Sequence, residues 1–438
     1  MIAIVVSRAD AASEHIGSHL RDLADWETTE DTSRPDGAGG GTVYRTDGFA
    51  LREFDALHLD IDDAADAFDD PELLVFASRH SGETGPLLTA HFTGNFGPAE
   101  YGGADDSLAE ACPNAQAALL SAFEEHAPAG YEVGMECTHH GPSRVGVPSM
   151  FVELGSGEEQ WEDPAGARAV AQAILDIEGV APHRDRTVVG FGGGHYVPRF
   201  ERVVRDTSWA VGHIAADWGL DAMGHPEEHR DVLAQAFEQS GAEYALVEGD
   251  RPALEAVVED LGYRVVTETW LRAVDGRDLE TVAALEEAIC PVADGLRFGT
   301  AATTGDWAVR DLPSALLDAA QGTDREAVLA AADEHLVAYE TIQSGSRVDG
   351  QGAVTPTGYD AFVDALVDVL AEKYDEVRRE DGEVVARSQA FDPALAHEAG
   401  VPEGPKFGRL AGGQAVEIDG RTIAPADVSS ERTERFPV

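Results

Sequence analysis

The chain has 438 residues, of which 82 are acidic and 31 are basic, so its formal net charge at pH 7 is −51. Two of the basic residues are lysines, Lys373 and Lys406, and the others are arginines. A surface rich in carboxylates stays hydrated in concentrated salt, where the Debye length falls to about 3 Å and repulsion between the carboxylates is screened. The composition therefore predicts a halophilic protein and argues against tight electrostatic binding of nucleic acid.

Cysteines are sparse, with Cys112, Cys137 and Cys290 scattered along the chain. Three such thiols make neither a disulfide framework nor a cysteine-rich zinc site, which fits a reducing cytosol. The apolar run at the N-terminus is too short for a signal peptide, and no later apolar run is long enough to cross a bilayer. We therefore expect a cytoplasmic protein without a membrane partner.

Short β-branched runs alternate with amphipathic helical segments up to about residue 275. Helices are expected at residues 107–126 and after Asp163, an N-cap that is followed by proline at the first helical position. Residues 27–41 and 60–72 are expected to be loops. The predicted strands are, in chain order, Ile2–Val6, Leu73–Ala77, Tyr131–Glu136, Met150–Leu154, Thr187–Phe191, Trp209–Ile214, Tyr244–Val247 and Arg264–Thr267.

This alternation predicts an α/β domain at residues 1–275, built on a mostly parallel sheet with helices on both faces. The pattern changes after residue 275, where the predicted helices are Leu279–Ile289, Arg325–Thr341 and Tyr359–Arg378. We therefore expect a mainly helical extension of unassigned role at residues 276–390, followed by a small strand-rich segment at residues 391–438.

Three segments rich in histidine and glycine each follow the carboxyl end of a predicted strand. The second segment contains Glu136, His139 and His140, and the third contains the glycine run Gly192, Gly193 and Gly194 followed by His195. Because a parallel sheet gathers such segments at one edge, we expect them to build one active site. The first segment contains the polar residues His80, Ser81, Glu83, Thr84, His91, Thr93 and Asn95.

Neutral imidazoles and a carboxylate can hold Zn²⁺ with one position left open. The glycine run offers backbone N–H groups to a phosphate or to a developing oxyanion. No lysine precedes Lys373, which excludes a Schiff base or a Walker lysine in the first domain, and no G-x-S-x-G motif occurs with a placed triad. The candidate metal ligands are His80, Glu136, His139, His140 and His195, and the chemistry is expected to be histidine- or metal-based hydrolysis.

The same segments resemble a known family. The blocks SRHSGETGPLLTAHFTGNFG (78–97), ECTHHGPSRVGVPSMFVELGSGEEQW (136–161) and GFGGGHYVPRF (190–200) look like the signature blocks of the archaeal and plant type of D-aminoacyl-tRNA deacylase. The resemblance extends from Met1 to about residue 275. It implies hydrolysis of the ester that joins a D-amino acid to the terminal ribose of tRNA, zinc dependence, and a fold related to peptidyl-tRNA hydrolases and nucleoside phosphorylases.

In this hypothesis Glu136, His139, His140 and His195 hold metal or move protons, and the 192–194 amides stabilise the oxyanion. The stretch from His80 to Asn95 forms a substrate-binding wall and contributes one metal ligand. Glycine-lined walls would admit a D side chain and clash with an L one. The nucleophile, a metal-activated water or the ribose 2′-OH, stays open, as does the number of zinc ions. The expected partner is the acceptor end of the tRNA, with a monomer as the simplest oligomeric state.

Two other functions compete with this hypothesis. The same fold would support a peptidyl-tRNA hydrolase or a nucleosidase, which would show no chiral preference on an unblocked aminoacyl ester. A non-catalytic tRNA-binding module would instead use Arg79, Arg144 and Arg199 for phosphate contacts, and its binding would survive removal of metal.

Overall fold

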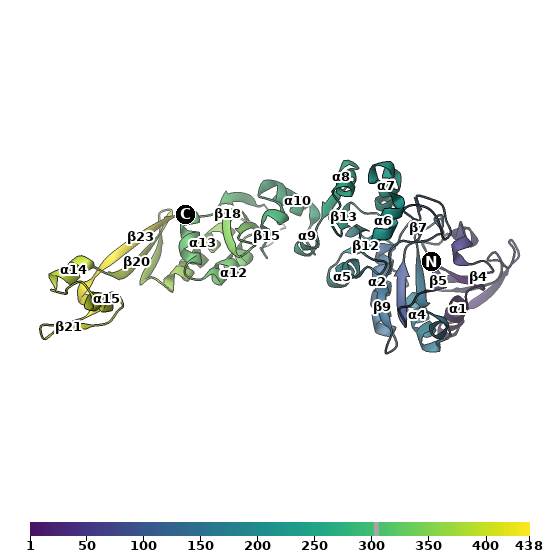
Figure 1. Ribbon diagram of the computed structural model, residues 1–438, viewed down its shortest axis with the longest axis horizontal. Coiled ribbons are helices and arrows are strands. Elements are labelled where there is room, and N and C mark those ends of the chain that lie inside the picture. The colour runs from purple at the N-terminus through teal and green to yellow at the C-terminus, as the bar shows by residue number, and fades with distance from the viewer. Residues whose placement is uncertain (302–305) are drawn as a thin grey trace. The chain divides into compact units, whose positions relative to one another are not determined.

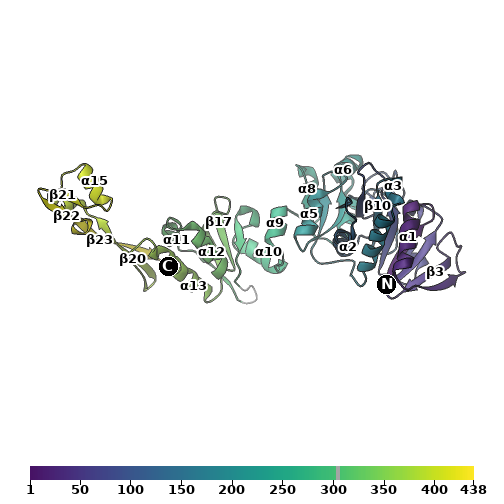
Figure 2. The ribbon, with the colours of Figure 1, turned by 90° about the horizontal axis from the view of Figure 1, so that it is seen from below.

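The computed structural model describes residues 1–301 and 306–438, and the chain divides into two compact units, Met1–Asp275 and Gly276–Val438. The first unit is coloured purple to teal in Figure 1, and the second is coloured green to yellow. Both units combine helices and strands, as Figure 2 also shows. The mixed α/β class expected for the first unit is confirmed.

The first unit is built on an eight-stranded sheet with the order β2-β3-β4-β1-β5-β10-β6-β9. β1 pairs in parallel with β4 and β5, β5 with β10, and β6 with β9, whereas β2–β3, β3–β4 and β10–β6 are antiparallel. Strands β6 and β9 therefore run opposite to β5 and β10. The strands are β1 (Ile2–Ser7), β2 (Glu27–Asp31), β3 (Gly41–Thr46), β4 (Phe49–Phe54), β5 (Leu73–Arg79), β6 (Leu87–His91), β9 (Glu132–Met135) and β10 (Ser149–Gly155).

Four of these strands are absent from the sequence prediction. β2 lies inside the expected 27–41 loop, because its sequence ETTED is polar and exposed and shows no apolar alternation. β3 and β4 extend the sheet from β2, and β6 is a buried strand within the first histidine segment. The antiparallel strands make the large sheet mixed rather than mostly parallel.

The two faces of this sheet are covered differently. Helices α1 (Ala11–Leu23), α2 (Pro113–His126) and α4 (Pro164–Asp176) pack together on one face, and the side chains of Asp10 and Asp163 cap α1 and α4. On the other face, Ile61 and Phe68 of the segment 58–68 pack in one cluster with core side chains of β5 and β10. That segment forms two 3₁₀ turns, His58–Asp60 and Ala64–Ala67, so the expected helices on both faces are wrong for this sheet.

A second, fully parallel sheet of the first unit has the order β12-β11-β13-β14. Helices α7 (Arg230–Glu238) and α8 (Pro252–Asp260) bury one face, while Phe200 of α5 (Pro198–Asp206) lies against Gly190 on the other. The strands are β11 (Thr187–Phe191), β12 (Ala210–Ala215), β13 (Tyr244–Val247) and β14 (Arg264–Val266). Short elements complete the unit: β7 (Gly94–Asn95), β8 (Ser107–Leu108), α3 (Glu158–Trp161), α6 (Asp217–Met223) and α9 (Glu268–Ala273).

The segment that follows β9 joins the two sheets. Glu136 forms a β-bridge with Tyr196, and the Cys137 amide donates to the His195 carbonyl at 3.0 Å. The Thr138 amide donates to the Ile214 carbonyl at 2.9 Å. This backbone pairing brings the second and third histidine segments side by side.

A buried histidine at this junction gives the first unit a pH-dependent stability. His213 is fully buried, its Nε2–H donates to the Ala109 carbonyl at 2.7 Å, and its Nδ1 lies 3.0 Å from the Thr138 hydroxyl. Burial lowers the pKa of His213 to about 4, against a smaller opposing effect of the Ala109 carbonyl. The folded state therefore keeps this ring neutral between about pH 6.5 and pH 4, where the unfolded chain binds a proton.

Replacing His213 with Gln is expected to remove this pH dependence. Because the unfolded state gains protons on acidification, the wild-type free energy of unfolding should lose about 2 kcal/mol between pH 7.5 and pH 5 through this group alone. The destabilisation caused by His213→Gln should therefore shrink by that amount over the same interval. Chemical denaturation of both proteins at the two pH values measures it, and an unchanged difference would contradict the assignment.

The second unit is not mainly helical, contrary to the sequence prediction. Its antiparallel sheet has the order β15-β17-β18-β16, and a second sheet has the order β19-β20-β23. The strands are β15 (Leu296–Phe298), β16 (Ala308–Asp311), β17 (Ala338–Ile342), β18 (Arg347–Val354), β19 (Glu376–Glu380), β20 (Glu383–Phe391), β21 (Val416–Ile418), β22 (Arg421–Ile423) and β23 (Ser429–Pro437). The helices are α10 (Leu279–Ala288), α11 (Ser314–Gln321), α12 (Arg325–His335), α13 (Gly358–Ala371), α14 (Pro393–Glu398) and α15 (Pro405–Ala411).

Two of the predicted helices are too long. α12 ends at His335 and is followed by β17, and α13 ends at Ala371 and is followed by β19. The strand β18 contains Gly350 and Gly352 among polar residues, so it lacks the alternation that predicts a strand. Across the described parts of the chain, no helix is both long enough and apolar enough to span a membrane.

Candidate active site

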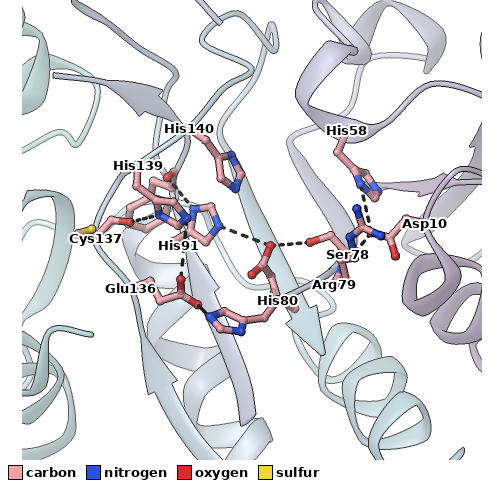
Figure 3. A network of polar contacts seen from close by, with 12 residues as sticks. Asp10, His58, Ser78, Arg79, His80, His91, Glu136, Cys137, His139 and His140 are labelled. Carbon is pink, nitrogen blue, oxygen red and sulfur yellow. Dashed lines mark hydrogen bonds and ion pairs between the residues drawn. The ribbon is translucent and has the colours of Figure 1, made fainter. Parts of the chain in front are cut away.

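The rings of three histidines, His91, His139 and His140, lie against one another, with centroids 4.3 to 4.6 Å apart (Figure 3). His91 is the last residue of β6, and His139 and His140 lie in the segment after β9. In each ring Nδ1 lies within hydrogen-bond distance of a backbone carbonyl. Because the carbonyl can only accept, Nδ1 carries the hydrogen and Nε2 keeps its lone pair. The acceptors are the carbonyls of Phe92, Cys137 and Gly141, at Nδ1···O distances of 2.9, 2.8 and 2.7 Å, respectively.

This arrangement fits a divalent metal ion. The ligand atoms of the three rings lie within 4.8 Å of one another, and the buried Nε2 of His91 has no hydrogen-bond partner. Burial lowers the pKa of His140 to about 3 and that of His139 well below its usual value, so both rings are neutral ligands at pH 7. Metal-binding imidazoles commonly donate their second N–H to a backbone carbonyl, as these do.

Two buried carboxylates flank the rings. Glu153 of β10 places Oε1 3.6 Å from His91 Nε2 and accepts a hydrogen bond from the Ser78 hydroxyl at 2.9 Å. Burial raises the pKa of Glu153. For His91 burial lowers the pKa, but Glu153 and Glu136 outweigh burial and the net shift is upward. The carboxylates thus favour a positive charge beside His91 Nε2, which a metal ion would supply.

Glu136 binds two further histidines. Its Oε2 lies 2.7 Å from His195 Nε2, and its Oε1 lies 3.5 Å from His80 Nε2. Burial by itself raises the pKa of Glu136, but the hydrogen bond from His195 and the nearby imidazoles hold that pKa at about 2. The carboxylate is therefore ionised at neutral pH and accepts a hydrogen bond from His195. With a side chain 33% exposed, His195 contacts solvent more than His80, His91 and His139 do.

The glycine run precedes His195, and two of its three amides are already hydrogen-bonded. Gly192 and Gly193 have φ angles of +94° and +85°, and a Cβ atom at Gly192 would lie 2.3 Å from the Glu248 carbonyl oxygen. The Gly192 amide donates to the Ala215 carbonyl at 2.8 Å, and the Gly193 amide donates to Asp217 Oδ1 at 2.8 Å. Both amides are occupied, so the expected oxyanion role of the run does not fit them. Gly194 is exposed.

His80 has partners at both ring nitrogens. It directly follows β5, with Nδ1 3.1 Å from the Ser156 hydroxyl and Nε2 3.0 Å from the Tyr196 hydroxyl. The Thr84 hydroxyl bonds Ser156 in turn. His80 therefore belongs to a hydrogen-bonded wall beside Glu136 and is less suited to ligate metal than the three rings described above.

The remaining predicted residues are dispersed. Ser81 is exposed and lines the site cavity, and Glu83 is exposed on the same connection. Thr93 is buried, and its hydroxyl has no hydrogen-bond partner. Asn95 donates its side-chain amide to the carbonyls of Gly102 and Ala104, at 3.0 and 3.2 Å, so it holds a loop and does not face the imidazoles.

A cavity of about 340 Å³ is lined by side chains of the site: His80, His139, His140, His195, Glu136 and Glu153. Its walls carry side chains that the sequence analysis missed, and these replace the expected glycine lining. For Glu153 the signal was a charged residue inside the apolar run Met150–Leu154. The missed lining residues are Asp10, Leu57, His58, Leu59, Ser78, Tyr101, Phe151 and Glu153.

The three arginines considered for phosphate binding differ in their surroundings. Arg79 lines the cavity with its guanidinium 5.2 Å above the Trp161 ring. Arg144 pairs with Asp63 at 2.6 Å, and Arg199 lies 3.7 Å from a Glu268 carboxylate oxygen. They do not form a common basic patch at the site.

The fold and the site define an α/β protein with a histidine-rich, metal-competent centre where two sheets meet. A family model described as D-aminoacyl-tRNA deacylase matches residues 67–266. The chain is 58% identical over 439 residues to the D-aminoacyl-tRNA deacylase of Natronomonas pharaonis and 56% identical over 450 residues to that of Haloarcula marismortui, with 100% of each chain covered. The chain belongs to the D-aminoacyl-tRNA deacylase family.

Two further proteins match different shares of the chain. A D-aminoacyl-tRNA deacylase of Methanoregula boonei is 32% identical, with 98% of this chain and 96% of that one covered. The second unit is therefore shared with relatives and is not peculiar to this chain. The crystal structure of a conserved protein of unknown function, AF0625, matches with a TM-score of 0.54 and 32% identity, covering 61% of this chain and 95% of that one.

Proposed function

We propose that this chain hydrolyses the ester bond of D-aminoacyl-tRNA, releasing the free D-amino acid and tRNA as a quality control of translation. The observation that carries the proposal is the group of three histidines whose ligand atoms lie within 4.8 Å of one another, beside the hydrogen bond between His195 and the buried Glu136. This group lies in a chain whose full-length relatives are named D-aminoacyl-tRNA deacylase.

The proposed metal ligands are His91, His139 and His140, with Zn²⁺ as the ion. This set omits His80, Glu136 and His195 of the sequence prediction and adds His91. Glu136 already contacts His195 and His80, and His80 also contacts the Tyr196 hydroxyl. When bound, zinc supplies Lewis acidity toward the ester carbonyl or toward water. Metal analysis of the purified protein would give the number of zinc ions bound per chain.

The proton-transfer residues are Glu136 and His195. His195 takes the proton of the attacking water and returns it to the leaving ribose oxygen. Glu136 accepts the Nε2–H of His195 and stabilises the imidazolium while it carries the extra charge. His80 and Tyr196 close the wall beside Glu136.

The proposed working environment is a cytoplasm of high salt. The excess of 82 acidic over 31 basic residues suits a chain that stays hydrated when salt screens its carboxylates. Recognition of the tRNA acceptor end would then rely on local contacts at the cavity and less on long-range attraction.

Removal of metal is expected to abolish the activity. The purified full chain in molar salt should hydrolyse D-tyrosyl-tRNA, and dialysis against EDTA should slow this by about 100-fold or more, with recovery on addition of Zn²⁺. Metal content and thermal unfolding of the same samples show whether the protein stays folded. Full activity with no bound metal would overturn the zinc part of the proposal.

A further inference from the structure

Exposed aromatic side chains gather around the site. Within residues 1–301 and 306–438, three large apolar side chains are strongly exposed: Tyr101 at 64%, Trp218 at 48% and Tyr196 at 37%. Single exposed aromatics are ordinary, but aromatics that cluster at one cavity commonly mark a binding surface. Tyr196 is tied to His80, which leaves Tyr101 and Trp218 without an assigned role.

These two side chains line a second cavity next to the first. It measures about 110 Å³ and is lined by Trp218, Tyr101, Thr138 and His139 among others. Tyr101 and His139 also line the 340 Å³ cavity. His139, a proposed metal ligand, therefore stands between the two spaces.

Trp218 is positioned by the turn that precedes it. It lies in the first turn of α6, where the Asp217 amide donates to the Gly193 carbonyl at 2.9 Å and Asp217 Oδ1 accepts from the Gly193 amide. The Trp218 side chain lies near the thiol of Cys137, the residue next but one before His139, where it acts to lower the thiol pKa against the larger effect of burial. The glycine turn that precedes His195 thus also positions Trp218, and the ring remains half exposed.

Tyr101 is anchored through its backbone. Its carbonyl accepts from the Gly141 amide at 3.0 Å, directly after His140. Asn95 holds the following residues through the carbonyls of Gly102 and Ala104, and the Ala104 amide donates to the Ser143 hydroxyl at 2.9 Å. These bonds fix the loop beside the imidazoles and leave the phenol ring at the surface.

We propose that Tyr101 and Trp218 form a stacking subsite for the 3′-terminal nucleobase of the substrate, an inference that rests on the proposed function. An ester carbonyl beside His139 places its ribose at the boundary of the two cavities. The base then enters the smaller cavity, and the amino-acid side chain enters the larger one. Stacking on aromatic faces needs no net positive charge and persists in high salt, so it suits a chain of charge −51.

The test compares two substrates that share the D-tyrosyl ester, only one of which is attached to a tRNA. D-tyrosyl-tRNA carries the terminal base, and D-tyrosine methyl ester does not. For Trp218→Ala and for Tyr101→Ala, the ratio of kcat/KM on the tRNA to kcat/KM on the methyl ester should fall about 10-fold or more, mainly through KM on the tRNA. Trp218→Phe and Tyr101→Phe keep a ring and should keep the ratio within about threefold.

Both rates are proportional to the fraction of folded protein, so this fraction cancels in the ratio and a destabilised variant remains informative. Tyr44→Ala is the matched control. Tyr44 lies on β3, beside the edge strand β2, and β9 forms the other edge of the sheet, so this variant should leave the ratio unchanged. A wild-type chain that does not hydrolyse D-tyrosyl-tRNA would overturn the proposed function. An active wild type whose ratio is unchanged in both alanine variants would overturn the stacking subsite alone.

Discussion

Replacing His139 with alanine is expected to lower kcat/KM for D-tyrosyl-tRNA about 1000-fold or more and to reduce bound metal. His139 is central to the cluster, with its ring centroid 4.3 Å from that of His91, 4.5 Å from His140 and 4.6 Å from His195. Its Nδ1 is held by the Cys137 carbonyl at 2.8 Å, so its Nε2 is the free ligand atom. Initial rates and metal analysis of the purified variant measure both effects.

His126→Ala is the matched control for this substitution. His126 pairs with Asp176 at 2.6 Å on the surface, and such exposed pairs contribute at most about 1 kcal/mol to stability. That variant should keep wild-type activity and metal content. A His139→Ala protein with full activity and full metal content would remove His139 from the site.

Replacing Glu136 with glutamine is expected to lower kcat by about 10²- to 10⁴-fold. Glutamine keeps the volume of the side chain but loses the charge that stabilises a protonated His195, 2.7 Å away. The pKa of about 2 shows that the buried carboxylate is ionised through its histidine partners, and the amide cannot replace that charge. Steady-state kinetics give kcat, and thermal unfolding shows whether the fold survives.

Glu110→Gln provides the control for this second substitution. Glu110 pairs with His183 at the surface, so the neutral side chain should leave kcat unchanged. A Glu136→Gln protein that retains a third or more of the wild-type kcat would contradict the role of Glu136 in proton transfer. Loss of metal together with loss of activity would instead make Glu136 a ligand.

The sequence predicted the residues of the site better than the way in which they meet. Convergence at one edge of a parallel sheet was expected, but β9 runs opposite to β5, and β11 belongs to another sheet. The segments after β9 and β11 meet because residues 136–138 pair with the second sheet through backbone hydrogen bonds. Such long-range pairing leaves no local signal in a sequence.

His91 shows why the metal set was only partly predicted. It was placed on the binding wall, because β6 was not predicted and a single histidine has several ordinary structural roles. In the sheet, Phe151 of β10 lies opposite His91, and Glu153 lies two residues further along that strand. The register with which β6 pairs with β10 therefore determines whether His91 lies near Glu153. Register depends on the turn and packing of the whole sheet, which residue types alone do not specify.

The chirality of the substrate tests the central claim most directly. The full chain in molar salt is mixed with D-tyrosyl-tRNA in one reaction and with L-tyrosyl-tRNA in another, and the rate of ester hydrolysis is measured in each. The account predicts that the D ester is hydrolysed at least about 100-fold faster than the L ester. Equal rates on the two esters, or no hydrolysis of the D ester, would contradict it.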